Sequence, residues 1–167
     1  PLEAGAEAED HRALLRTLLA ISDKVVPLEP DSVVLDVHRT AHFFGGEAAT
    51  MVRARRLIEE LGHACRLAIG DAPEAALAVA LTHQADVRIE TGSGAEALAP
   101  LPITTLHPAK VLRASLRTIG IRTIGQWAAL DPASVAGRFG EEGRRLHLLA
   151  RGGRLLHTAG HFEQQQA

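Results

Sequence analysis

The segment from Asp31 to Val37 carries two acidic residues whose type suits metal-dependent phosphoryl transfer. Such sites hold two divalent cations about 4 Å apart and need several carboxylates that converge on the ions. Side chains alternate between the two faces of a strand, so Asp31 and Asp36 point in opposite directions. The spacing therefore predicts that they do not share a metal ion. We expect Asp31 to be a turn residue and Asp36 to cap the loop that follows.

Other residue types that bind metals or attack substrates lack partners in the sequence. The pairs His38/His42 and His157/His161 have the i,i+4 spacing of zinc ligands on a helix, but neither pair lies on a predicted helix or has a third ligand nearby. Cys65 falls in a predicted buried strand, which is typical of an inert core thiol. We therefore expect no metal and no cofactor.

Composition indicates a globular protein with an aliphatic core. Of 167 residues, 46% are hydrophobic but only 3% are aromatic, so Leu, Ala, Val and Ile must fill the interior of one domain or two small ones. There is no run of eighteen apolar residues, which predicts no membrane span. With no secretory pattern and a single cysteine, the expected location is the cytoplasm.

Charge is distributed unevenly along the chain. Residues 1–99 hold 9 Lys/Arg against 16 Asp/Glu, a balance of −7, whereas residues 100–167 hold 9 against 4, a balance of +5. A basic half suggests an anionic partner. An unevenly charged, solvated surface explains the same counts equally well.

Periodicity and turn residues predict an α/β segment followed by helices. Strands are expected at 25–28, 33–37, 64–69 and 87–89, and helices at 10–21, 47–61, 74–82, 108–118, 123–130, 132–138 and 141–151. The order β-α-β-α-β predicts an open sheet with 33–37 as its central strand and Val33, Leu35 and Ile69 in its core; parallel and antiparallel pairing both remain open. Asp71 is the expected N-cap of the helix at 74–82. The segment 154–167 is expected to be a flexible tail.

Six segments occur in the order found in one protein family, across residues 14–152. They are Phe43–Glu47, Gly62–Ile69, the alanine-rich Glu74–Leu81, Ala97–Pro102, Gly120–Trp127 and Arg138–Gly140. Together with Asp31–Val37, they resemble the ImuB-type relatives of the Y-family DNA polymerases. The resemblance implies an α+β fold: a partial ferredoxin-like palm at 1–97, then a small helical thumb with a degenerate helix-hairpin-helix at 98–153.

The same resemblance implies a missing metal ligand. Family members carry an adjacent Asp-Glu pair on this strand, and here Asp31 takes the Asp position while Ser32 replaces the Glu. A neutral hydroxyl cannot replace a bridging carboxylate. Asp31 is then a vestigial position, there is no catalytic residue, and Mg²⁺ is expected only if the chain belongs to an active polymerase.

The thumb resemblance identifies candidate DNA contacts. The family's phosphate-binding turn falls on His107–Pro108–Ala109, where proline has no N–H to donate. The glycines of Gly120–Gly125 are expected to form a structural corner. The residues implied to contact DNA, weakly and without sequence preference, are Lys110, Arg113, Arg117, Arg122, Thr123 and Gly125.

The resemblance therefore implies a non-catalytic adaptor in damage-induced (SOS) mutagenic translesion synthesis. Its implied partners are DNA, a sliding clamp, an error-prone polymerase and an accessory mutagenesis protein. Two alternatives stay open: a fragment of an active Y-family polymerase, and a helix-hairpin-helix DNA-binding module unrelated to lesion bypass.

Overall fold

The structure, a computed structural model, describes residues 2–28 and 31–155 and divides them into two compact units. Unit 1 extends to Leu67 and unit 2 begins at Ala68. The boundary expected after residue 97 separates the palm and thumb domains that the family resemblance implies. It is a different division from the two compact units, and it stays a prediction. Most of the expected tail, residues 156–167, lies outside the described residues.

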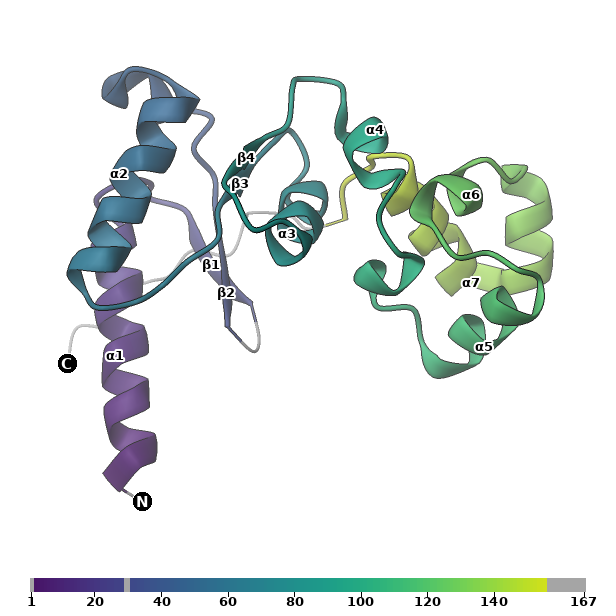
Figure 1. Cartoon of the computed structure of the whole chain (residues 1–167), viewed down its shortest axis with the longest axis horizontal. Coiled ribbons are helices and arrows are strands. Elements are labelled where there is room, and N and C mark those ends of the chain that lie inside the picture. Colours follow the sequence, from purple (N-terminus) through teal and green to yellow (C-terminus); the bar gives the residue numbers. More distant parts are fainter. Residues whose placement is uncertain (1, 29–30, 156–167) are drawn as a thin grey trace. The chain divides into compact units, whose positions relative to one another are not determined.

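Helices and short strands follow one another in the predicted order (Figure 1). Unit 1 contains α1 (Leu2–Leu18), β1 (Val25–Leu28), β2 (Ser32–Leu35), the 3-10 helix η1 (Ala41–Phe44) and α2 (Glu47–Glu60). Unit 2 contains β3 (Ala68–Ile69), α3 (Pro73–Thr82), β4 (Val87–Arg88), α4 (Gly94–Leu98), the 3-10 helix η2 (Ile103–Leu106), α5 (Lys110–Thr118), α6 (Ile124–Ala128) and α7 (Pro132–Ala150). The α+β prediction is confirmed.

In unit 1, two helices and a hairpin enclose a small core. β1 and β2 pair antiparallel, with Val25 opposite Leu35. The leucines of α1 recur at helical spacing, which places Leu15 and Leu18 on one buried face. They pack with Ile21, Val25 and Ile58 of α2, and Val33 and Leu35 lie half-buried against this cluster.

The predicted single sheet is wrong in detail. Among the described residues, β2 pairs only with β1 and all four of its residues are half-buried, so it is not a central strand. The strand expected at 64–69 is reduced to β3, which pairs in parallel with the two residues of β4. Ile69 therefore belongs to unit 2 and does not share a core with Val33 and Leu35.

The predicted cap of α3 is also wrong. Ala72 is the N-cap residue, and the carboxylate of Asp71 instead accepts a hydrogen bond from the backbone N–H of Gly92, at 2.7 Å. The side chain of Asp71 thus closes the loop after β4. α3 keeps Pro73 in its first turn, where a missing N–H costs nothing.

The core of unit 2 surrounds Trp127, which is fully buried. The ring of Phe139 meets the indole edge to face at 5.1 Å between centroids, and His147 meets it at 6.0 Å. α7 consists of two helical segments separated at Gly140 (φ 61°, ψ −153°), a non-helical conformation suited to glycine, which agrees with the separate helices expected at 132–138 and 141–151.

Asp131 begins α7 as its N-cap. Its carboxylate accepts hydrogen bonds from the backbone N–H of Ser134 at 2.8 Å and from the Ser134 hydroxyl at 2.9 Å. The backbone bond is the larger reason that the pKa of Asp131 lies below its usual value, since both bonds favour the charged form. Among the described residues, no helix combines the length and apolarity that a membrane span requires.

Two residues of α5 test the packing of unit 2. Leu116 is 1% exposed and Val111 is 80% exposed. Leu116→Ala should lower the free energy of unfolding by about 2–5 kcal/mol through the cavity it leaves. Val111→Ala, the control on the same helix, should change it by no more than about 0.5 kcal/mol. Urea unfolding followed by the fluorescence of Trp127 measures both. Equal losses of unfolding free energy in the two variants would contradict the orientation of α5 with Leu116 inward and Val111 outward.

Candidate nucleic-acid interface and acidic hairpin

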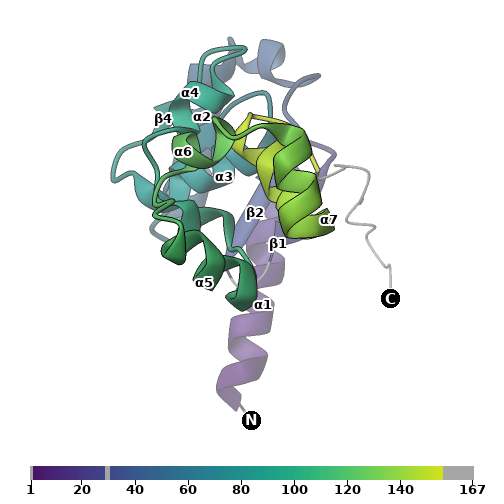
Figure 2. The same ribbon diagram turned by 90° about the vertical axis from the view of Figure 1, so that its right-hand side faces the viewer.

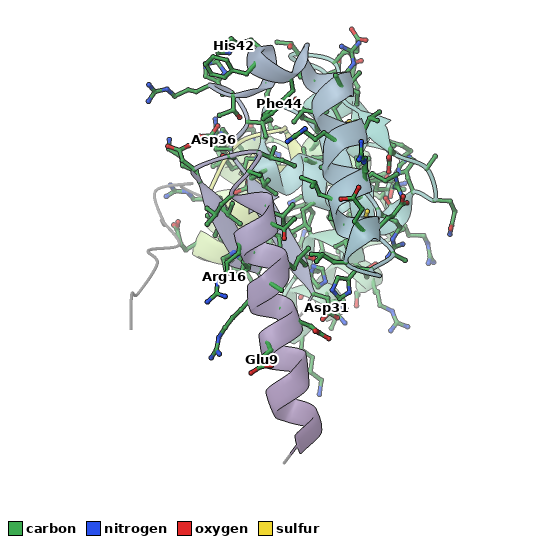
Figure 3. All side chains as sticks on the ribbon, turned by 90° about the vertical axis from the view of Figure 1, so that its left-hand side faces the viewer. Glu9, Arg16, Asp31, Asp36, His42 and Phe44 are labelled. Carbon is green, nitrogen blue, oxygen red and sulfur yellow. The ribbon has the colours of Figure 1, made fainter. Side chains whose placement is uncertain are left out.

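The two carboxylates of the hairpin lie at opposite ends of β2 (Figure 3). Asp31 is an exposed turn residue directly before the strand, and Asp36 follows its last residue. The expectation that they do not converge is confirmed. Ser32 opens β2 opposite Leu28 and is half-buried. Among the described residues, no three His, Cys, Asp or Glu side chains are grouped closely enough to hold a metal ion.

Asp36 forms contacts that hold the loop after β2. Its Oδ2 lies 3.3 Å from the ammonium of Lys24, and its Oδ1 accepts the backbone N–H of His38 at 3.1 Å. Its backbone carbonyl accepts the hydroxyl of the buried Ser22 at 2.5 Å. Asp36 thus caps the loop after β2, as expected, and ties that loop to the start of the hairpin.

The remaining metal-binding candidates that the structure describes are not grouped as a site. His42 stacks on the neighbouring ring of Phe43 with centroids 3.9 Å apart. His157 and His161 lie outside the described residues. Cys65 is half-buried in an irregular segment rather than buried in a strand, which corrects its expected setting. Its backbone carbonyl accepts a hydrogen bond from Arg55 at 3.1 Å.

Four of the six predicted DNA-contacting residues are exposed cations on or just after α5. Leu112 and Leu116 occupy the buried face of this helix, so Lys110, Arg113 and Arg117, at i, i+3 and i+7, share the solvent face. The guanidinium of Arg113 donates to the carbonyl of Pro108 at 3.3 Å. The turn at Gly120 (φ 79°) then reverses the chain and leads to Arg122.

Arg117 and Arg122 line a common hollow. It has a volume of about 460 Å³, and Ala114 and Thr118 complete its lining. Within the described part of the chain, neither guanidinium forms an ion pair with a carboxylate. Arginine presents a fork of N–H donors that matches a phosphate group. The hollow can therefore receive an anion. Thr118 was not singled out from the sequence, because nothing in its spacing distinguishes it from other helical threonines.

Thr123 and Gly125 form hydrogen bonds within the fold. The Thr123 hydroxyl accepts the N–H of Gln126 at 3.3 Å, and the Gln126 side chain accepts the N–H of Thr123 at 3.2 Å, which forms a capping box at α6. Gly125 donates its N–H to the carbonyl of Ala99 at 2.9 Å. Ile124 is fully buried, as expected for a structural corner. A DNA contact at Thr123 or Gly125 stays a prediction.

The turn before α5 departs from a glycine turn. His107 adopts a left-handed conformation (φ 49°, ψ 53°), which is unusual for a residue with a side chain. Pro108 is fully buried. Ala109 is the N-cap residue of α5 and has no side-chain hydrogen bond of its own to offer.

Sequence comparisons relate this chain to known proteins. The chain is 34% identical to the protein ImuB of Caulobacter vibrioides over 110 residues, which is 66% of this chain and 24% of ImuB. It is 33% identical to DNA polymerase IV of Caulobacter vibrioides over 151 residues, 86% of this chain and 37% of the polymerase. The chain therefore spans between a quarter and two fifths of these relatives. No protein-family model matches.

A solved structure confirms the fold. The crystal structure of DinB from Sulfolobus solfataricus superposes with a TM-score of 0.71 over 90% of this chain and 46% of DinB. The sequences are 18% identical over this region, so the likeness concerns the fold.

Gly125→Ala tests whether this glycine serves the fold. An added Cβ would lie 3.0 Å from both the carbonyl oxygen and the Cβ of Ala99, so the free energy of unfolding should fall by about 1–3 kcal/mol. The control is Gly137→Ala in α7, where nothing lies within 4 Å of the added atom and stability should rise by about 0.5–1 kcal/mol. Urea unfolding separates the two. Unchanged stability with weaker DNA binding in Gly125→Ala would assign Gly125 to the interface.

Proposed function

Because the chain is an ImuB-like protein related to the Y-family DNA polymerases, we propose that it is non-catalytic and acts as an adaptor in damage-induced mutagenic translesion synthesis. In this role it contributes a weak contact with DNA, and it synthesises no DNA itself. Since it covers only part of its relatives, the activity and partners of the whole protein belong to the proposal.

The observation that carries the non-catalytic proposal is the arrangement of acids around β2. Among the described residues, Asp31 is the acid of the turn, with Ser32 beside it, and Asp36 lies beyond the far end of the strand, bound to Lys24 and to the backbone of His38. A two-metal centre needs several carboxylates directed at one point. The described part of the hairpin supplies one carboxylate at this end of β2, Asp31, which supports the proposal that no catalytic pair of ions assembles here.

The DNA contact is supported by the solvent face of α5 and the hollow after it. Lys110, Arg117 and Arg122 are exposed cations, and the two arginines face a common hollow of phosphate-compatible chemistry. Side-chain charges on an open surface bind the DNA backbone without reading bases. Weak binding without sequence preference follows from this chemistry.

The adaptor role further implies contacts with a sliding clamp, an error-prone polymerase and an accessory mutagenesis protein, in the cytoplasm. These partners follow from the relationship to ImuB rather than from any described surface. An active polymerase fragment and an unrelated DNA-binding module are the competing functions. The first requires paired metal ions, and the second requires DNA binding without any role in lesion bypass.

The chain is expected to bind no pair of divalent ions at the hairpin. Mn²⁺ is the probe, since it broadens the NMR signals of nearby amides; residues 31–36 should show no site-specific broadening, and primer extension should stay at background. Ser32→Glu should also leave primer extension at background, because two adjacent carboxylates are still too few for a two-metal centre. Two ions beside Asp31, or measurable synthesis, would favour the active polymerase.

Reversing the charge of the hollow should weaken DNA binding. In the double variant Arg117→Glu/Arg122→Glu, affinity for every duplex should fall without a change in sequence ranking. The wild-type dissociation constant should lie at about 10⁻⁴–10⁻⁶ M, and log K should fall with log salt at about 0.9 per phosphate neutralised. Fluorescence anisotropy of labelled duplexes measures both quantities.

The control is Arg12→Glu/Arg16→Glu, which makes the same change in net charge on the exposed surface of α1 in unit 1. It should bind DNA nearly as the wild type does. Equal affinity in the wild type and the Arg117→Glu/Arg122→Glu variant would contradict a DNA contact at these two arginines.

A further inference from the structure

The start of α5 is occupied by a carboxylate from a distant part of the chain. The backbone N–H of Ala109 donates to Oε1 of Glu142 at 2.6 Å, across 33 residues. The first N–H groups of a helix have no partner within the helix and carry partial positive charge, so they attract anions. Ala109 cannot cap the helix with its own side chain, and Glu142 places a carboxylate at this end of α5 by accepting the N–H of Ala109.

The fold holds Glu142 in this position. α5 and α7 lie in contact within unit 2 (Figure 2). After the kink at Gly140, Glu142, Leu146 and Leu149 recur at i, i+4 and i+7, so Glu142 shares the inward face with two buried leucines and is itself half-buried. Its neighbour Glu141 is exposed and pairs with Arg144 on the outer surface.

A second observation fixes the path of α7 after the kink. Gly143 is buried, and a Cβ there would lie 2.4 Å from the Cβ of Phe139, whose ring packs against Trp127. No side chain fits at that position, so glycine is required where the second half of α7 lies against Phe139. This close approach within α7 holds the segment that carries Glu142.

We propose that Glu142 is an internal anion that fills the N-terminus of α5 and excludes a DNA phosphate from it. This inference rests on the proposed DNA contact and refines it. Lys110 begins the basic face of α5 beside the Glu142 carboxylate, and Arg117 and Arg122 line the hollow at the other end of the helix. Phosphate contact is thereby confined to side-chain charges, because the Glu142 carboxylate accepts the N–H of Ala109 and repels a second anion from this end of the helix.

The test compares Glu142→Gln with Glu141→Gln in the full chain. Both variants remove one negative charge from adjacent residues, but only the first weakens the anion at Ala109. Inorganic phosphate is titrated while the amide signals of Ala109, Lys110 and Val111 are followed by NMR, and duplex affinity is measured in parallel. Glu142→Ala and Glu141→Ala repeat the comparison with the side chain removed.

Phosphate should shift the three amide signals in the Glu142 variants and leave them unmoved in the wild type and the Glu141 variants. Duplex affinity should rise about three- to tenfold in the Glu142 variants, the size of a charge interaction at a helix N-terminus. It should rise about twofold or less in the Glu141 variants, where the charge is exposed and screened.

Equal behaviour of the Glu142 and Glu141 variants would overturn the proposal. Loss of the fold in both Glu142 variants would also overturn it, since Glu142 would then be a stabilising cap. Phosphate-dependent shifts in the Glu142 variants, without duplex binding by any form of the chain, would sustain the exclusion of phosphate and refute the proposed DNA contact instead.

Discussion

The contact between Trp127 and Phe139 is the interaction on which the rest of unit 2 depends. The chain has few aromatic residues, yet two of them meet edge to face at 5.1 Å in the centre of this unit. Such a pair contributes about 0.5–1.5 kcal/mol beyond the area it buries. Trp127 belongs to α6 and Phe139 to α7, so the pair fixes the angle at which α7 leaves the corner. The indole N–H has no hydrogen-bond partner among the described residues.

The charged surface of unit 2 follows from that packing. Once the first half of α7 is held by Phe139, the turn at Gly140 directs the second half towards α5 and places Glu142 at its start. The buried Leu112 and Leu116 orient α5 with its cations outward. The positive face and the carboxylate that limits it are therefore two results of one core arrangement.

Local sequence patterns predicted the structural features that neighbouring residues determine. They did not predict the features that depend on residues far apart in the sequence. The order of the elements and the outward cations of α5 could be predicted, because hydrophobic periodicity and helix-ending residues are local signals. The extent of the strand at 64–69 could not, because its partner β4 lies further along the chain, after α3. Asp71 had two acceptable acceptor roles, and the position of Gly92, 21 residues away, decided between them.

The same distinction applies to the candidate site. Arg117 and Arg122 were predicted from charge and the family resemblance, whereas the common hollow and its Thr118 depend on the turn at Gly120. Glu142 gave one local signal, a glycine followed by two glutamates that open a helical segment. This pattern predicts an acid at the start of the second half of α7. It does not predict that the acid contacts the start of α5.

The hairpin of unit 1 separates the residues that hold its fold from Asp31 and Ser32. Asp36 contacts Lys24 and the backbone of His38 through its carboxylate, and Ser22 through its carbonyl. These contacts join the loop after β2 to the segment before β1, so Asp36 serves the fold. Asp31 is an exposed turn residue, and Ser32 joins the strand through its backbone pairing with Leu28, which any side chain permits. An acid at position 32 thus contributes little to the hairpin itself. Because Lys24, Asp36 and Ser22 hold the hairpin and the side chain of Ser32 does not, a neutral residue at position 32 is compatible with an intact hairpin.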